Sequence, residues 1–353
     1  METNWIKKKK IFSKRFYSLV ALFLLILIPI LTITLWINWA ISAPATSGKA
    51  KVFVIQENES TVSIANRLKE EGLIRDSLVF RIYTRINCKG IDLANPESLL
   101  KKYATSDCLS GNIQAGSFKL SPTMTLATLS VTLTKGRLDS WTKIIEGLRD
   151  EEIAAILAKN YNIKAEDFLK EAKEGYMFPD TYLFSLNSTA KDLATKMREN
   201  FDTKFSPDLQ SKVKAQGLTV QEGVILASIV QREAGKSSDA PTIASIFLNR
   251  LNSGMPLGSD ATVQFALGYD QTTKTWWKKD LTDQDLTIDS PYNTRIVTGL
   301  PPGPICNPGL AALKAVAEPA VTDYYYFLHD KDGNLHPAKT LQEHNANKIR
   351  YLQ

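Results

Sequence analysis

The stretch ILASIVQREAG, residues 225–235, is a nearly apolar helical run that finishes with an acid, Glu233, beside a glycine. A glycine just after the last periodic residue is a C-cap signal, so the pattern predicts Glu233 in the last helical turn. The helix dipole is negative there, and both the dipole and burial would raise the pKa of the carboxyl. A neutral carboxylic acid at neutral pH is what general-acid cleavage of a glycosidic bond requires. The alternative is an ordinary solvated helix residue.

The sequence around this run predicts further helices and then a long loop. Thr219 and Glu222 form a capping box that starts the same helix, and Asp239 starts the next one. Beyond Gly254 the chain is predicted to form loops, above all over residues 290–309 (SPYNTRIVTGLPPGPICNPG). Long irregular stretches in a compact domain are usually functional or disordered, and the aromatics and fixed turns here favour function.

The first forty residues hold most of the net charge and the most apolar segment. The 353-residue chain has a net charge of +6, of which residues 1–40 account for +5. Residues 1–15 form a basic tail, and residues 16–40 are predicted to be a transmembrane anchor because about 20 apolar residues span a bilayer. The basic tail predicts a cytoplasmic N-terminus, with the bulk of the protein outside. The alternative is a signal peptide cleaved near Ala45, for which the apolar run is long.

The remaining sequence has the composition of an ordinary globular protein and is long enough for two domains. It is nearly neutral, so no nucleic-acid partner is expected. The predicted fold class is α+β. A polar linker (41–51) leads to a small α+β module (52–137) and then to a helix-rich α+β domain (138–353). Strands are predicted at 52–55, 116–120 and 324–328, and helices at 60–68, 78–86, 126–134, 150–159, 165–173, 190–205 and 206–215.

Several chemistries have no basis in the sequence. There is no G-x-S-x-G motif and all three histidines lie in residues 329–344, which argues against a Ser-His-Asp enzyme. There is no C-x-x-C or H-E-x-x-H, so no metal or other cofactor is expected. Cys88 and Cys108 flank a polar loop, where they would either form a disulfide in an oxidising compartment or stay as two thiols.

Six motifs follow one another along nearly the whole chain and carry a resemblance. They are AGSFKL (115–120), EGYMFPDTYLF (174–184), LASIVQREAG (226–235), ASIFLNRLNSGMPLGSDATVQFALG (244–268), SPYNTRIVTGLPPGPICNPG (290–309) and GNLHPAKTLQEHN (333–345). Together they resemble the endolytic murein transglycosylases of the MltG (YceG-like) family. The resemblance implies a single-pass protein of the inner (cytoplasmic) membrane, with a LysM-like module before the catalytic domain. Such a lyase cuts the bond between N-acetylmuramic acid and N-acetylglucosamine within nascent peptidoglycan strands.

The resemblance also implies a catalytic residue. The family's acid is the second glutamate of an Ile-Val-Glu-Lys-Glu-Thr type segment. In this chain the first glutamate is replaced by Gln231 and the second is Glu233. Glu233 would protonate the glycosidic oxygen and then, as a carboxylate, take the proton of the muramic C6 hydroxyl, which leaves a 1,6-anhydro end.

Polar and aromatic side chains of the loop region are candidates for the substrate groove. These residues are Asp260, Gln264, Tyr292, Asn293 and Thr294. Each has a structural alternative, as a cap, a turn residue or a residue that holds the loop together. The family's tyrosines after Asn-Thr and after Val-Gln are replaced here by Arg295 and Phe265. His336 and His344 match family positions and are interpreted as structural.

Two other functions stay open at this point. One is a hydrolytic muramidase, in which Asp260 would activate water or act as a nucleophile. The other is a non-catalytic scaffold that binds the cell wall. The expected partners are peptidoglycan strands and the membrane, together with peptidoglycan synthases or the elongation or division machinery. Whether the LysM-like module binds glycan or only positions the catalytic domain also stays open.

Overall fold

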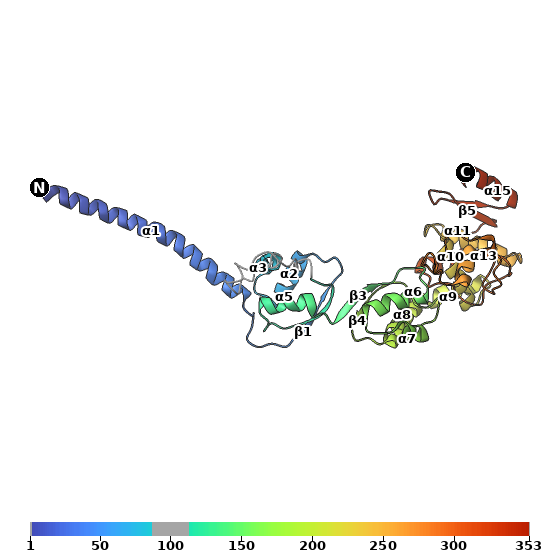
Figure 1. Ribbon diagram of the computed structural model, residues 1–353, viewed down its shortest axis with the longest axis horizontal. Helices are drawn as coiled ribbons and strands as arrows, with labels where there is room; N and C mark the ends of the chain where they lie inside the picture. The colour runs from blue at the N-terminus through green and yellow to red at the C-terminus, as the bar shows by residue number, and fades with distance from the viewer. Residues whose placement is uncertain (1, 87–112, 353) are drawn as a thin grey trace. The chain divides into compact units, whose positions relative to one another are not determined.

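The computed structural model describes residues 2–86 and 113–352, without the side chains of residues 2–15, 18 and 86. It combines helices with small two-stranded sheets (Figure 1). The chain divides into two compact units, Met1–Trp141 and Thr142–Gln353, which are described separately. Cys88 and Cys108 lie outside the described residues, so their pairing stays a prediction.

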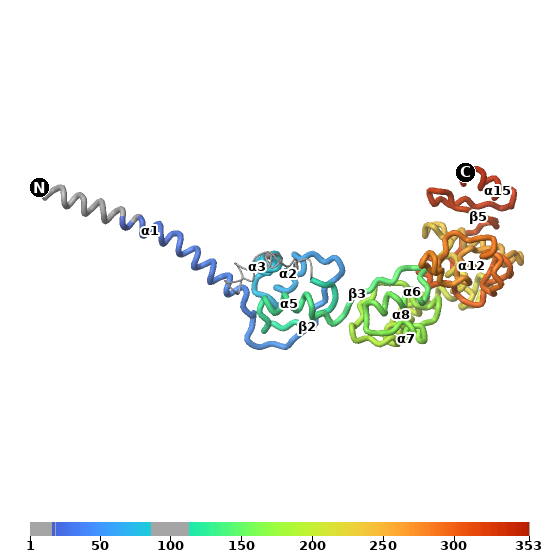
Figure 2. The backbone as a smooth tube through the Cα atoms, viewed as in Figure 1, coloured from blue at the N-terminus to red at the C-terminus, as the bar shows by residue number. Residues whose placement is uncertain are grey.

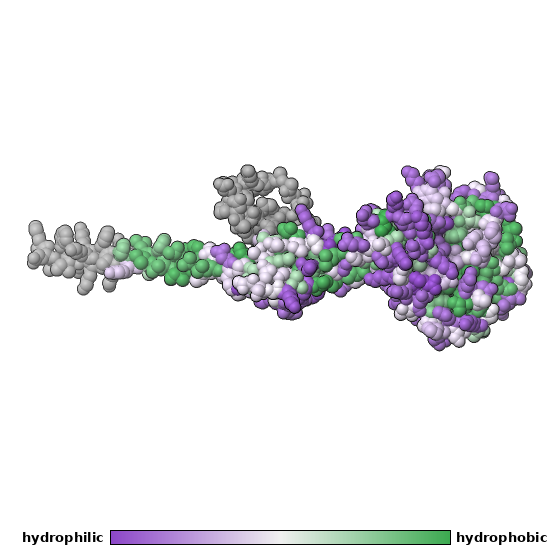
Figure 3. All heavy atoms as spheres, turned by 90° about the horizontal axis from the view of Figure 1, so that it is seen from below, coloured by the Kyte–Doolittle hydropathy of each residue, from purple (hydrophilic) through white to green (hydrophobic). Residues whose placement is uncertain are grey.

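Unit 1 begins with one long helix, α1 (Glu2–Ile41). Its segment Leu19–Ile41 is long and apolar enough to cross a membrane, with a mean hydropathy of 2.8. Nearly all of the described side chains in this segment are exposed, and Figure 3 shows them as a hydrophobic band along the helix. Exposed aliphatic side chains gain nothing from packing, so this segment suits a lipid environment. A helix of this kind near an N-terminus also fits a signal sequence.

The rest of unit 1 is a small α+β module. Its elements are β1 (Lys51–Ile55), α2 (Thr61–Glu70), α3 (Ser77–Ile86), β2 (Gly116–Leu120) and α5 (Leu126–Lys135). The two strands pair antiparallel with Phe53 opposite Phe118. These rings and Phe80 are fully buried in the core of the module. The five predicted elements of this module are confirmed to within two residues at each end.

Unit 2 starts with a helical layer beside a short strand pair. Its elements are β3 (Asp139–Lys143), which begins in unit 1, then α6 (Asp150–Asn160), α7 (Ala165–Glu171), β4 (Thr181–Ser185), α8 (Ala190–Lys204) and α9 (Pro207–Ala215). The four helices are confirmed, whereas the two strands were not predicted. Hydrogen-bonding side chains begin α8 and α9, since Thr189 and Ser206 each accept a backbone N–H of the first turn.

A buried polar cluster ties the start of α6 to the loop before α14. Asn307 donates from Nδ2 to Asp150 Oδ1 (2.9 Å) and to Glu174 Oε1 (3.1 Å). Burial, and next the Asp150 charge, raise the pKa of Glu174 to about 9, and burial raises the pKa of Asp150 to about 6. Two carboxyls packed together in a poorly solvated place cannot both ionise easily, so this cluster holds a proton at neutral pH.

The centre of unit 2 is a group of three packed helices, α10 (Val220–Glu233), α11 (Ala240–Asn252) and α14 (Leu310–Ala317). Residues 223–230 of α10 are buried on all sides, which is why its sequence is apolar around the whole helix. Thr219 and Glu222 form the predicted capping box. Glu233 is the last residue of the helix, as predicted. Ala234, rather than Gly235, is the C-cap, with an extended backbone.

The C-terminal part of unit 2 contains more regular structure than the sequence predicted. Residues beyond Gly254 include α12 (Asp260–Leu267) and the short α13 (Asp283–Leu286), and α14 follows the long loop. The antiparallel pair β5 (Tyr326–His329) and β6 (Leu335–Ala338) leads to α15 (Leu341–Leu352), and these elements lie together at the end of the chain (Figure 2). The predicted strand and turn near residue 330 are confirmed, whereas α12 to α15 and β6 were not predicted.

Candidate active site

The Glu233 side chain lines a polar cavity of about 480 Å³ within unit 2. The end of α10, α11, the start of α12, β5 and α15 contribute to its wall. The lining residues are Glu233, Phe247, Arg250, Leu257, Gly258, Ser259, Asp260, Arg295, Phe327, Leu328, His329, His344 and Lys348. The cavity therefore combines sequence segments that are up to about 115 residues apart, among them two carboxyls and several cations.

The Glu233 carboxyl bridges from the end of one helix to the start of another. Ser259, the N-cap residue of α12, donates from Oγ to Glu233 Oε1 at 2.5 Å instead of capping its own helix. The backbone N–H of Ala261, in the first turn of α12, also bonds the carboxyl. The carboxyl thus lies at the negative end of α10 and the positive end of α12.

The pKa of Glu233 is raised above its ordinary value. The largest cause is burial, which disfavours the charged form, and the charge of Asp260 acts in the same direction. The hydrogen bonds from Ser259 and Ala261 and the charge of Arg232 lower the pKa without cancelling the effect of burial. The direction agrees with the sequence argument, and the structure adds the donors that oppose the shift.

Thr294 and Asn293 support this arrangement from inside the protein. The Ser259 backbone N–H donates to Thr294 Oγ1 (3.2 Å), which also hydrogen-bonds with Thr262 Oγ1 (2.8 Å). Asn293 donates from Nδ2 to the carbonyls of residues 286 and 288, both at 3.0 Å. Both side chains are buried and bonded within the protein, which is the structural alternative for each. Their assignment to the substrate groove stays a prediction.

Asp260 lies in the same cavity as Glu233. It is the first residue of α12, its side chain is exposed, and Oδ1 pairs with Arg295 Nη1 at 2.5 Å. Arg295 stands where the family pattern has a tyrosine, so this chain places a guanidinium group beside the second acid of the cavity. The paired Asp260 carboxylate is exposed to solvent at the rim of the cavity.

Gln264 and Tyr292 do not line the cavity. Gln264 donates from Nε2 to the carbonyl of Lys278 (2.9 Å), and the Tyr292 ring packs on Phe265 with 4.7 Å between ring centroids. Both residues therefore hold the loop that follows α12 in this structure, which is the structural alternative for each. Their assignment to the groove stays a prediction for a substrate that extends beyond the cavity.

Most residues of the cavity wall were not predicted from the sequence. Ser259, Arg250 and Lys348 were not singled out, and His344 was interpreted as structural although it lines the cavity. The His344 ring stacks on Tyr326 at 5.5 Å, and burial lowers the pKa of its imidazole. The signal that was available is the C-terminal motif of residues 333–345, which contains His344. A motif far from the acid in sequence gave no reason to bring it to the same cavity.

His336 differs from His344 in its surroundings. His336 Nε2 lies 2.9 Å from Asp330 Oδ2, and its ring stacks on Tyr351 at 3.6 Å. It does not line the cavity. These contacts join β6 to the turn at residue 330 and to α15, so they fit the structural interpretation of His336.

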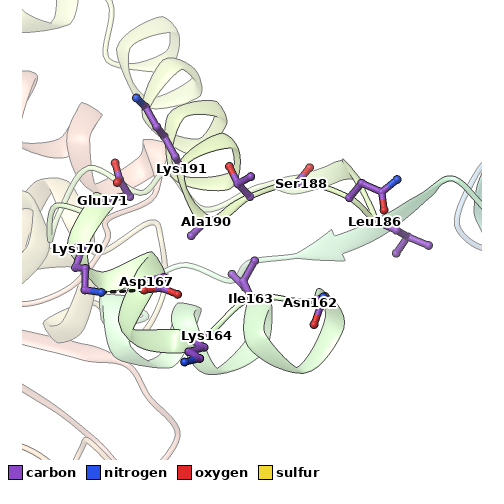
Figure 4. A pocket seen from close by; sticks show the side chains of 12 residues that line it. Asn162, Ile163, Lys164, Asp167, Lys170, Glu171, Leu186, Ser188, Ala190 and Lys191 are labelled. Atoms are coloured by element: carbon purple, nitrogen blue, oxygen red, sulfur yellow. Dashed lines mark hydrogen bonds and ion pairs between the residues drawn. The ribbon is translucent and has the colours of Figure 1, made fainter.

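A second cavity of unit 2, of about 740 Å³, lies between α7 and the start of α8 (Figure 4). Its charged side chains include Asp167 and Lys170, which pair with each other at 2.8 Å. It is larger than the Glu233 cavity, but it contains no candidate site residue. The Glu233 cavity is the stronger candidate, because it contains an acid whose pKa is shifted upward. Among the described residues, no group of three His, Cys, Asp or Glu side chains could hold a metal ion.

A helical domain with a carboxyl of raised pKa in a polar cavity is the class of site that acid–base enzymes use. The YceG-like family model matches residues 53–350, and the chain belongs to this family. It is 31% identical over 315 residues to a Bacillus subtilis protein named endolytic murein transglycosylase, and the match covers 84% of each chain. It is 29% identical over 336 residues to a protein of that name from Streptococcus pneumoniae, covering 87% of this chain and 59% of the pneumococcal protein. A crystal structure of a yceG-like protein from Listeria monocytogenes matches with a TM-score of 0.56 and 28% identity, over 84% of this chain and 98% of that one.

Proposed function

We propose that the protein is a membrane-anchored lytic transglycosylase that cuts peptidoglycan strands internally, with Glu233 as its catalytic acid and base. The observation that carries the proposal is the Glu233 carboxyl, whose pKa is raised in a polar cavity while Ser259 fixes its direction. The names of the relatives support the substrate and the reaction.

In the proposed reaction a single carboxyl acts twice. Neutral Glu233 donates its proton to the oxygen that links N-acetylmuramic acid to N-acetylglucosamine, and the bond from muramic C1 to that oxygen breaks. The carboxylate then takes the proton of the muramic C6 hydroxyl, whose oxygen bonds to C1 and closes the 1,6-anhydro ring. The proton balance is restored and no water is consumed. Asp260 and Arg295 border the reacting sugars at the rim of the cavity.

The proposed topology is that of the sequence prediction. Residues 1–15 lie in the cytoplasm, residues 16–40 cross the inner membrane, and a linker (41–51) leads to the parts outside. Residues 52–137 form the LysM-like module and residues 138–353 the catalytic domain. The exposed apolar segment of α1 supports the anchor. The proposed partners are nascent glycan strands and the synthases or the elongation or division machinery that produce them.

A hydrolytic muramidase is the second candidate, because Asp260 lies in the same cavity as Glu233. A second carboxylate near the acid could activate water, which would then attack C1 in place of the C6 hydroxyl. The two reactions share the first proton transfer and differ only in the product end. Asp260 is paired with Arg295, which favours a positioning role over that of a base.

The test is a digest of purified peptidoglycan by the full chain in detergent, with Glu233→Gln beside it and the products weighed by mass spectrometry. Anhydro-ended fragments, one water lighter than hydrolysis products, are expected from the wild type and not from the variant. Water-bearing ends that disappear in Asp260→Asn would establish the muramidase. If folded wild-type protein released no fragments, a non-catalytic role in binding the cell wall would replace both enzymatic proposals.

A further inference from the structure

We propose that the α15 wall of the Glu233 cavity binds a carboxylate on the muramic acid unit, with Lys348 as the main contact. The inference rests on the proposed function and adds to it a preference among substrates. The muramic unit carries its anionic groups on the substituent at C3, either as the free lactyl carboxylate or as the carboxylates of an attached stem peptide. The sugar rings themselves are uncharged.

The side chains that line the cavity include more cations than carboxyls, and the inference starts from this difference. Three cations line the cavity, Arg250, Arg295 and Lys348, against two carboxyls, Glu233 and Asp260. The Glu233 carboxyl favours its neutral form through burial, and Asp260 is already paired with Arg295. The cavity therefore carries excess positive charge, which attracts an anionic ligand. An uncharged sugar ring alone would not use this charge.

The three cations differ in the hydrogen bonds and ion pairs that they already make within the protein. Arg250 is fixed by backbone carbonyls, since Nε donates to Tyr325 O (2.6 Å) and Nη1 to Leu257 O (2.5 Å). Arg295 is engaged by Asp260. Lys348 has no ion pair or hydrogen bond with any side chain in the described ranges, and its side chain is exposed. Of the three, Lys348 is therefore the cation available to a ligand.

The position of Lys348 also suits a ligand attached to the reacting sugar. It is on α15 and borders the same cavity as Glu233, together with His344 one helical turn earlier. Residues four apart share a helix face, so Lys348 and His344 form one polar side of the cavity. A ligand seated against Glu233 through its glycosidic oxygen would present its C3 substituent within a few ångströms of that oxygen.

The test compares kcat/KM of the full chain on three substrates. They are native peptide-bearing strands, strands stripped of peptides by an amidase, and native strands whose carboxylates have been converted to amides. Lys348→Met is the test variant and Lys348→Arg restores the charge. Lys331→Met is the matched control, because Lys331 is exposed on the turn between β5 and β6 and does not line the cavity.

Lys348→Met is expected to lower kcat/KM about threefold to fivefold on native strands, through KM, as an exposed ion pair would. It should leave the amidated strands unchanged, and Lys348→Arg and Lys331→Met should behave like the wild type. Added salt of about 0.5 M should shrink the difference. A loss on native strands alone would identify a stem-peptide carboxylate as the ligand. A loss on the stripped strands as well would show that Lys348 also binds the free lactyl carboxylate that the amidase exposes.

Two results would overturn the inference. One is an equal effect of Lys348→Met on native and amidated strands, and the other is no effect on either. Failure of the proposed function is a different outcome, because the wild-type protein would then release no fragments from any of the three substrates.

Discussion

Replacing Ser259 by alanine removes the hydroxyl that donates to Glu233 Oε1 at 2.5 Å. That bond stabilises the carboxylate more than the neutral acid, and it lowers the pKa of Glu233 against the effect of burial. A hydrogen bond to a charged group contributes about 1.5–3 kcal/mol and one to a neutral group about 0.5–1.5, so the difference corresponds to about one pKa unit. Ser259→Ala should therefore raise the pKa of Glu233 by about one unit.

The measurable result is a shift of the alkaline limb of kcat/KM. In the proposed reaction the first proton transfer needs neutral Glu233, so activity should be lost as pH rises through its pKa. In Ser259→Ala this loss should occur about one pH unit higher than in the wild type. The assay follows fragment release from peptidoglycan between about pH 4 and 9 in buffers of constant ionic strength.

Ser253→Ala serves as the matched control, because Ser253 is an exposed serine whose hydroxyl contacts Tyr325 at 3.3 Å and does not line the cavity. Its alkaline limb should coincide with that of the wild type. A limb that stayed in place or moved to lower pH in folded Ser259→Ala would refute the role of this hydrogen bond. Circular dichroism would establish that the variant is folded.

Two further predictions concern stability. Burial raises the pKa of Glu174 to about 9, so the native state keeps a proton that the unfolded chain releases above about pH 4.5. The free energy of unfolding, from urea denaturation of the full chain, should fall as pH rises from about 5 to 9, and Glu174→Gln should flatten this dependence. A Cβ on Gly223 would lie 2.4 Å from Val213 Cγ1. Gly223→Ala should therefore lower the free energy of unfolding by about 1 kcal/mol, although alanine has the better helix propensity. Val213→Ala added to it should recover most of that loss, and a stabilised single variant would contradict the packing argument.

The sequence was informative where local rules decide the structure. Thr219 and Glu222 predicted the start of α10, and the apolar period predicted Glu233 in its last turn. Gly235 was misleading because Ala234 leaves the helix in an extended conformation, so no left-handed residue is needed. The start of α12 at Asp260 was missed because a helix of eight residues between glycines has little periodic signal.

The sequence singled out both carboxyl residues of the candidate site, Glu233 and Asp260, but little of the wall around them. Glu233 stood out because its helix end is unfavourable for a carboxylate. Ser259 and Lys348 became visible only in the fold, since they are 26 and 115 residues from Glu233 and no local pattern links them. Asn293 and Thr294 were named because polar residues in a loop suggest exposure. In the fold both are buried and hydrogen-bonded to backbone groups, which no local sequence pattern indicates.

Two helix ends meet at the Glu233 carboxyl, and this affects the balance between the two steps of the proposed reaction. The negative C-terminal end of α10 destabilises the Glu233 carboxylate, and the backbone N–H groups at the start of α12 stabilise it. These opposed influences narrow the free-energy gap between the two protonation states. An enzyme that used separate residues for its half-reactions could tune each one independently. If Glu233 serves both half-reactions, a change in its pKa that favours proton donation disfavours proton uptake. A small free-energy difference between its neutral and charged forms therefore suits the whole cycle.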